Sequence, residues 1–281
     1  MITELTRAVT RIDVKTGDEV LLISDLHWDN PHCDRALLKR HMDQAVAKGA
    51  YILVNGDLFC AMQGKYDRRS CKDDVRPEHQ VATYLDALVE TAIEWFAPYA
   101  AHLAVIGRGN HETAITKNHE TDLTDRLCAG LRIRHGSKVV AGGYGFWVHL
   151  QDARNGTKKI FAHHGAGGGG PVTRGIIQTN RRACFVDGAD IIWSGHIHEA
   201  WALESMKVGT DKNGNVNQST VYHVSTPTYK EEYGDGHLGW HVERMAPPKP
   251  LGGYWLKLST SKRGSGGRDT KQLYITMERT D

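Results

Sequence analysis

The sequence predicts an α/β fold in which two β-sheets pack against each other. In the first half of the chain, short apolar runs alternate with stretches of helical spacing, which indicates right-handed crossovers and a parallel sheet. In the second half, runs of strand character follow one another with turns between them, which favours a more antiparallel sheet. Polar clusters also follow several predicted strands, at the edge where ligands bind in parallel sheets.

The first half supplies the predicted parallel sheet and its helices. Continuous apolar runs, typical of strands that are buried on both faces, occur at residues 19–24, 51–54 and 103–106. Apolar side chains recur with helical spacing at residues 32–48, 77–96 and 121–129. Gly49 stands where the first of these helices is expected to end.

The second half supplies the predicted second sheet. Its strands are expected at residues 144–150, 158–162, 191–193, 200–205, 220–224, 254–258 and 273–277. No repeat and no tether-like linker divides the chain, so we expect a single domain over residues 1–281. Residues 200–281 are expected to complete the second sheet. Within them, residues 229–244 are interpreted as a lid or specificity loop, with a self-association surface as the alternative.

Composition limits the class of protein. Hydrophobic residues make up 40% of the 281 and charged residues 24%, which is enough for a sizeable core. The net charge of +2 excludes a strongly basic protein, so a nucleic-acid partner would need a local basic patch. Five cysteines without a C-x-x-C pair argue against a disulfide framework and fit a reducing compartment. Without an apolar signal segment or membrane-spanning run, we expect a cytoplasmic protein with no membrane partner.

Five polar clusters carry the candidate chemistry. Each follows a predicted strand, and they are Asp25-Leu26-His27, Gly56-Asp57, Gly109-Asn110-His111-Glu112, His163-His164-Gly165 and Gly195-His196-Ile197-His198. Carboxylate, amide and imidazole groups together suit a pair of divalent transition ions better than a structural zinc, which usually takes Cys and His. Two such ions about 3.5–4 Å apart form a clamp for attack on phosphorus. The clusters therefore predict a metal-dependent phosphoesterase.

These clusters resemble the motifs of the calcineurin-like metallophosphoesterase superfamily. The series D-x-H, G-D, G-N-H-E, a histidine after a strand, and G-H-x-H runs in the family's order from Asp25 to His198. The resemblance implies a four-layer αββα sandwich, in which two face-to-face mixed β-sheets are flanked by helices. It also implies two divalent metal ions, a hydroxide between them as the nucleophile, and a phosphate ester as the substrate.

Carried over residue by residue, the resemblance implies two ligand sets that share Asp57. One metal would be held by Asp25, His27, Asp57 and His198, and the other by Asp57, Asn110, His163 and His196. His111 would lie beside the leaving group, as general acid or transition-state stabiliser, and Glu112 would orient an imidazole from behind. We expect manganese because an oxygen-rich, mixed ligand set tolerates it, with iron, zinc or nickel as alternatives.

The fourth motif leaves a choice between two neighbouring histidines. We assign the ligand to His163, because residues 160–163 (I-F-A-H) align better with the family's V-x-x-H pattern. His164 is then a candidate for binding substrate, together with Arg108 before the third motif and Arg174 after a glycine-rich segment. For Arg174, a solvated surface position is the alternative.

Three functions follow, in order of preference. The first is a phosphodiesterase, most simply a nuclease on DNA or RNA, because D-x-H and G-N-H-[DE] resemble the motifs of repair-type exonucleases. The alternative is a phosphomonoesterase that acts on a small phosphate or nucleotide with the same metal core. A non-catalytic scaffold is disfavoured, because Asn110, His111 and both distal histidines are present. The sequence specifies no oligomeric state.

Overall fold

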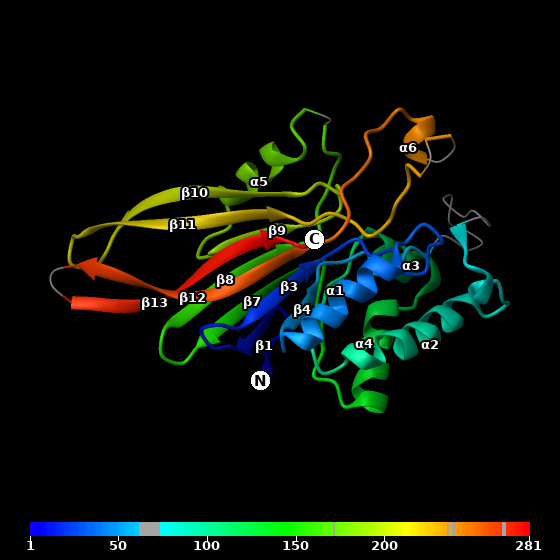
Figure 1. Cartoon of the computed structure of the whole chain (residues 1–281), viewed down its shortest axis with the longest axis horizontal. Coiled ribbons are helices and arrows are strands. Elements are labelled where there is room, and N and C mark those ends of the chain that lie inside the picture. The colour runs from blue at the N-terminus through cyan, green and yellow to red at the C-terminus, as the bar shows by residue number, and fades with distance from the viewer. Residues whose placement is uncertain (62–73, 171, 235, 238–239, 266–267) are drawn as a thin grey trace.

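The computed structural model describes the chain except for residues 62–73, 171, 235, 238–239 and 266–267. Two mixed β-sheets, one of six strands and one of seven, share a core of buried side chains that both sheets contribute. Helices pack on the outer face of each sheet (Figure 1). The predicted four-layer αββα sandwich is therefore confirmed.

The six-stranded sheet is built around the apolar runs of the first half. Its parallel strands are β3 (Glu19–Ile23), β4 (Tyr51–Val54), β5 (Leu103–Ile106) and β6 (Val140–Ala141). β12 (Tyr254–Ser265) pairs antiparallel with β3, and β13 (Arg268–Arg279) pairs antiparallel with β12. Along β3, Leu21 packs toward the helices while Leu22 packs toward the other sheet. Burial on both faces explains the continuous apolar sequence.

Helices cover the outer face of this sheet. They are α1 (Arg35–Ala47), α2 (Tyr84–Phe96), α3 (Asn110–His119) and α4 (Leu123–His135) (Figure 1). Apolar side chains such as Leu38, Leu88 and Leu127 join Ile52 and Val54 of the sheet in one core cluster.

The predicted helices needed three adjustments. The helix expected at 77–96 begins as a separate 3-10 turn at Pro77–His79, and α2 starts only at Tyr84. The helix expected at 121–129 continues to His135. α3 was not predicted, because its first residues are the polar third motif and it buries only Glu112 and Ile115.

The seven-stranded sheet combines two strands from the N-terminus with five strands from the second half of the chain. In spatial order they are β1 (Ile2–Thr6), β2 (Val9–Asp13), β7 (Gly145–Asp152), β8 (Gly156–His163), β9 (Ile191–Ser194), β11 (Val216–Ser225) and β10 (Trp201–Thr210). α5 (Ile176–Ala183) packs on its outer face through Ala183, beside Ile192 and Val221. β1 was not predicted, because it is largely exposed and lacks an apolar run.

The C-terminal part contributes to both sheets, and not to the second sheet alone. The hairpin β10–β11 completes the seven-stranded sheet, whereas the hairpin β12–β13 extends the six-stranded sheet beside β3. Both hairpins project from one end of the molecule, away from α1 to α4 (Figure 1). Within the described residues, no helix has the length and apolar character needed to cross a membrane.

Candidate metal centre

The polar segments that follow β3, β4, β5, β8 and β9 meet at one end of the sandwich. Two groups of potential metal ligands that share no residue form there, the first from Asp25, His27 and His198, and the second from Asp57, His164 and His196. A third group, His27, Cys60 and His111, shares His27 with the first. Within each group, the ligand atoms lie within 4.8 Å of one another. His164 joins the two groups, because its Nε2 lies 3.1 Å from Asp57 Oδ2 and 3.9 Å from Asp25 Oδ1.

Asp25 is the anchor of the first group. Its carboxylate is fully buried and accepts the backbone N–H of His196, at 3.1 and 3.0 Å from its two oxygens. The Ser24 hydroxyl donates to the same carboxylate. His198 Nε2 lies 3.3 Å from Asp25 Oδ1 and 3.4 Å from His27 Nε2. The three side chains therefore face one small space.

Asn110 completes the second group with an amide oxygen. Its Oδ1 lies 2.8 Å from His196 Nδ1 and 3.2 Å from His164 Nε2. Asp57 is also buried, and burial alone would raise its pKa. The adjacent His164 and His111 imidazoles instead hold the pKa of Asp57 well below its usual range. The carboxylate is therefore ionised and surrounded by nitrogen donors.

The structure places His164, and not His163, among these ligands. The side chains of Ile160 and Ala162 on β8 face the core between the sheets. Because successive side chains of a strand alternate, position 164 shares that face and position 163 does not. His163 is half-buried beside Tyr144, with a ring-centroid distance of 5.2 Å. The geometry therefore replaces His163 by His164 in the candidate ligand set, and removes His164 from the substrate-binding residues.

The backbone is strained at five candidate ligands. The angle φ is positive, between 45° and 73°, at Asp25, His27, Asp57, His196 and His198. Such a conformation costs a residue with a side chain roughly 1–3 kcal/mol, and it persists where surrounding contacts enforce it. Strain concentrated in one cluster indicates that the fold fixes these side chains for a function.

His111 lies beside both groups. Its Nδ1 is 2.5 Å from the Cys60 carbonyl oxygen, which can only accept, so Nδ1 carries the proton of the neutral ring. Its Nε2 lies 3.9 Å from Asp57 Oδ2. The His111 ring packs edge-on against His27, with centroids 4.8 Å apart. This position, next to the ligands, suits the role expected for His111 at the leaving group.

The residues present fit divalent cations. Burial opposes a charge on His164, yet the carboxylates of Asp57 and Asp25 raise its pKa to about 10, so this space strongly favours positive charge. His27 Nε2 and His198 Nε2 face each other at 3.4 Å beside the Asp25 carboxylate, an arrangement that suits two nitrogens sharing one cation. A donor set of carboxylate, amide and imidazole suits first-row divalent ions.

Comparison of the chain with known protein families identifies this site. The profile of the calcineurin-like phosphoesterases matches residues 19–200, more than half of the chain. The chain belongs to the calcineurin-like phosphoesterase family. A search of curated proteins returned no match. Members of the family typically bind two divalent metals, and the two ligand groups are candidate positions for them. The protein is therefore a metal-dependent phosphoesterase.

In this calcineurin-like phosphoesterase, the Glu112 carboxylate accepts hydrogen bonds from backbone N–H groups, and not from an imidazole as expected. Its carboxylate accepts the N–H groups of Asp57, Phe59 and Gly109, at 3.1, 2.9 and 2.7 Å. Burial and the Asp57 charge raise the pKa of Glu112 to about 8. By binding the turn after β4 and the start of α3 together, Glu112 fixes the backbone on which Asp57 and Asn110 stand.

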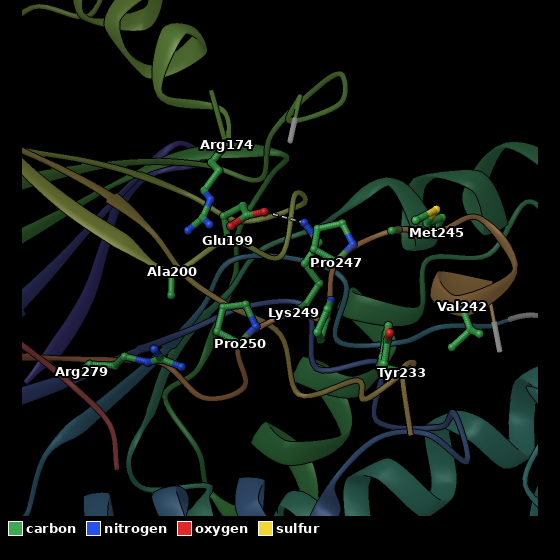
Figure 2. A pocket seen from close by; sticks show the side chains of 12 residues that line it. Arg174, Glu199, Ala200, Tyr233, Val242, Met245, Pro247, Lys249, Pro250 and Arg279 are labelled. Atoms are coloured by element: carbon green, nitrogen blue, oxygen red, sulfur yellow. Dashed lines mark hydrogen bonds and ion pairs between the residues drawn. The ribbon is translucent and has the colours of Figure 1, made fainter. Parts of the chain in front are cut away.

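The two arginines expected at the substrate lie outside the ligand cluster. Arg108 Nε is 2.7 Å from Asp122 Oδ2, and its Nη2 is 3.1 Å from Asp125 Oδ2. Its Nη1 donates to the Gly142 carbonyl at 2.8 Å. The Arg108 guanidinium thus ties the end of β5 to α4. Arg174 lines a separate pocket, whose lining contains none of the candidate metal ligands (Figure 2).

Sequence reasoning missed Asp29. Its buried carboxylate accepts the backbone N–H groups of Cys60 and Ala61, at 2.5 and 2.8 Å. It therefore shapes the loop that follows Asp57 and that positions the Cys60 carbonyl for His111. The signal that could have found Asp29 is the spacing of Asp25, His27 and Asp29, which alternate in one short polar run.

A second group of charged residues reaches the centre from the segment after β11. Lys230 forms an ion pair with Glu232, and His241 Nδ1 lies 3.7 Å from Glu232 Oε2. Burial, then the His111 ring, then Lys230 lower the pKa of His27, so the Lys230 charge acts on the ligand cluster. This segment lies within residues 229–244, interpreted from sequence as a lid or specificity loop, and no short motif distinguishes Lys230.

Proposed function

We propose that this metal-dependent phosphoesterase is a phosphodiesterase whose substrate is a nucleic-acid strand. The observation that carries the proposal is the junction of the two ligand groups at His164, with His111 beside them. The sugar oxygen that leaves a nucleotide strand is a poor leaving group and needs a proton. A positioned acid next to two cations provides that proton where the bond breaks.

The proposed ligand set is the one expected from sequence, with His164 in place of His163. One ion would be held by Asp25, His27, Asp57 and His198, and the other by Asp57, Asn110, His164 and His196. When bound, the ions would supply positive charge to the phosphoryl oxygens and lower the pKa of the attacking water. Manganese is the proposed ion, with iron, zinc and nickel as alternatives that elemental analysis distinguishes.

The proton at the leaving group is proposed to be handled by His111. Because the Cys60 carbonyl holds the Nδ1 proton, Nε2 is the atom that takes up a second proton, and the resulting imidazolium would give that proton from Nε2 to the leaving oxygen and return to the neutral ring. The His111 backbone N–H donates to Asp57 Oδ1 at 2.9 Å, and this bond fixes the position of His111 relative to that ligand. Asp29 and Glu112 hold the intervening loop by accepting its backbone N–H groups.

The proposed activity is tested with matched substrates and manganese-loaded protein. Bis-p-nitrophenyl phosphate and labelled DNA and RNA oligonucleotides should be hydrolysed faster than p-nitrophenyl phosphate. Turnover of the monoester alone would overturn the proposal in favour of a phosphomonoesterase. If neither ester type turned over while metal content was intact, a non-catalytic binding role would replace it.

A further inference from the structure

A pocket of about 740 Å³ is lined by Glu199, the residue after the candidate ligand His198 (Figure 2). Its wall takes residues from the ligand-bearing segment after β9 and from the charged segment after β11. Glu199 in its wall directly follows His198, and Val242 directly follows His241. Tyr233, also in the wall, directly follows Glu232, which pairs with Lys230. A substrate whose phosphate lies at the metal centre can therefore extend into this pocket.

The pocket carries a net positive charge. Lys249 Nζ lies 2.6 Å from Glu199 Oε1, and both side chains are mostly buried, so these two charges neutralise each other. Arg174 and Arg279 also line the pocket, and neither forms an ion pair with a carboxylate of the described residues. Both lie on the side of the pocket that Ala200 lines (Figure 2). Arg279 Nη2 donates to the Leu251 carbonyl at 3.2 Å, and the remaining N–H groups of Arg279, with those of Arg174, suit a phosphate.

Apolar side chains and one aromatic ring also line the pocket. They include Tyr233, Val242 and Pro247, which lie away from Ala200 and Arg279 (Figure 2), together with Pro248 and Pro250. Aromatic rings stack on nucleobases without regard to sequence, and the proline rings add apolar surface. The pocket volume lies within the usual range for small organic ligands, about 300–1,000 Å³. A flat base joined to a phosphate matches both kinds of lining residue.

Most of this lining lies outside the part of the chain that the family shares. The family match ends at residue 200, whereas Tyr233, Val242, residues 245–250 and Arg279 come later. The pocket is therefore a property of this chain's C-terminal part, added beside a common metal core. Such an addition is suited to choosing a substrate, because the core alone supplies the reaction.

We propose that this pocket binds the nucleotide next to the scissile phosphodiester. Its base would lie against Tyr233 and the proline-rich wall, and its own phosphate against Arg174 and Arg279. Base stacking requires an unpaired base, so the substrate class is a single strand of DNA or RNA. This inference rests on the proposed phosphodiesterase function and names the substrate of the same site.

The first test compares a long substrate with a short one. The double variant Arg174→Ala/Arg279→Ala should lose about 10- to 100-fold in kcat/KM for a single-stranded oligonucleotide, because charge-assisted hydrogen bonds are lost. Its kcat/KM for bis-p-nitrophenyl phosphate, which is too small to reach both groups, should stay within about twofold. The double variant Arg7→Ala/Arg154→Ala removes two exposed arginines elsewhere and is the control of equal charge change. Equal losses on both substrates, or none on either, would overturn the inference.

The second test measures binding without hydrolysis. A fluorescein-labelled trinucleotide is titrated into the full-length protein in EDTA, with DNA and RNA versions in separate arms. The double variant should bind more weakly, and its slope of log K against log salt should be shallower by about 1.4, the value for two lost contacts to single strands. Tyr233→Leu should weaken binding about tenfold while leaving that slope unchanged.

The outcomes separate the inference from the proposed function. If the wild-type protein hydrolysed bis-p-nitrophenyl phosphate but neither bound nor cleaved oligonucleotides, the pocket assignment would fail and the phosphodiesterase function would stand. If no diester were hydrolysed but trinucleotide binding depended on Arg174 and Arg279, the nucleotide site would stand and the proposed function would fail.

Discussion

The Nε2 atom of His164 lies 3.1 Å from Oδ2 of Asp57, across the gap between the two sheets' ligand-bearing loops. The other ring nitrogen, Nδ1, lies 2.7 Å from the carbonyl oxygen of Asn55. Because a carbonyl only accepts, Nδ1 keeps the proton and Nε2 is directed at the centre. A backbone carbonyl behind an imidazole is a common way to orient a metal ligand.

The two adjacent histidines should therefore behave differently when each is replaced by alanine. His164→Ala removes the imidazole between Asp57 and Asp25, so the purified variant should retain roughly half of the wild-type metal and lose most activity. His163→Ala, the matched control, should keep both, because its ring packs beside Tyr144. Elemental analysis per chain measures the difference, and metal loss in His163→Ala would contradict the assignment.

His111→Ala should separate turnover from metal binding. The ring lies beside the ligands, and its Nε2 is proposed to handle the leaving-group proton, so turnover should fall by roughly 10²–10⁴. Metal content should remain near wild type, whereas Asp57→Ala should lose metal as well as activity. Comparable metal loss in the two variants would show that His111 acts as a ligand.

The motif residues could be predicted because their chemistry is local. Asp25, His27 and Asp57 follow apolar runs that can only be buried strands, and the carboxyl ends of such strands gather at one edge. The choice between His163 and His164 needed the side-chain alternation of β8, which Ile160 and Ala162 reveal. In the sequence, residues 160–162 (I-F-A) are apolar throughout, so the sequence alone does not show which of the two histidines faces the core.

The contacts that support the site could not be predicted, because they join segments far apart in the chain. Thr228 Oγ1 donates to the Asp25 carbonyl at 2.7 Å, and the Tyr229 N–H donates to the same oxygen at 3.1 Å. Nothing in the sequence marks residues 228 and 229 as contacts of Asp25, which precedes Thr228 by 203 positions. Backbone strain at Asp25 was likewise invisible, because non-glycine residues rarely adopt positive φ.

A single methyl group should disrupt the centre at Gly109. A Cβ at this position would overlap the Asp57 carboxylate and backbone nitrogen, whereas a Cβ at Gly168 would meet nothing within 4 Å. Gly109→Ala should therefore displace Asp57, lower metal content and destabilise the protein by about 1–3 kcal/mol. Gly168→Ala is the matched control and should resemble wild type. Urea unfolding in EDTA and metal analysis test both, and an unchanged Gly109→Ala would refute the close packing.

Acid should destabilise the fold partly through His41, a buried histidine on α1 that belongs to neither ligand group. The buried ring is held between the Tyr229 hydroxyl, 2.8 Å from Nδ1, and the Asp281 carbonyl, 2.9 Å from Nε2. A carbonyl accepts only, so the neutral ring with its proton on Nε2 satisfies both partners. Burial lowers the pKa of His41, although the Asp281 carbonyl partly opposes this shift.

Because the folded pKa of His41 is depressed, the unfolded chain takes up this proton at higher pH than the folded one. The contribution of His41 to the free energy of unfolding should therefore be complete above about pH 6.5, the ordinary histidine value. It should be lost as the pH drops from there through the lowered pKa of the folded protein. His41→Gln cannot titrate, so its stability should decline less steeply, by up to about 1.4 kcal/mol per pH unit. Urea unfolding in EDTA between pH 5 and 8 measures both slopes, and parallel curves would exclude His41 as a source of acid sensitivity.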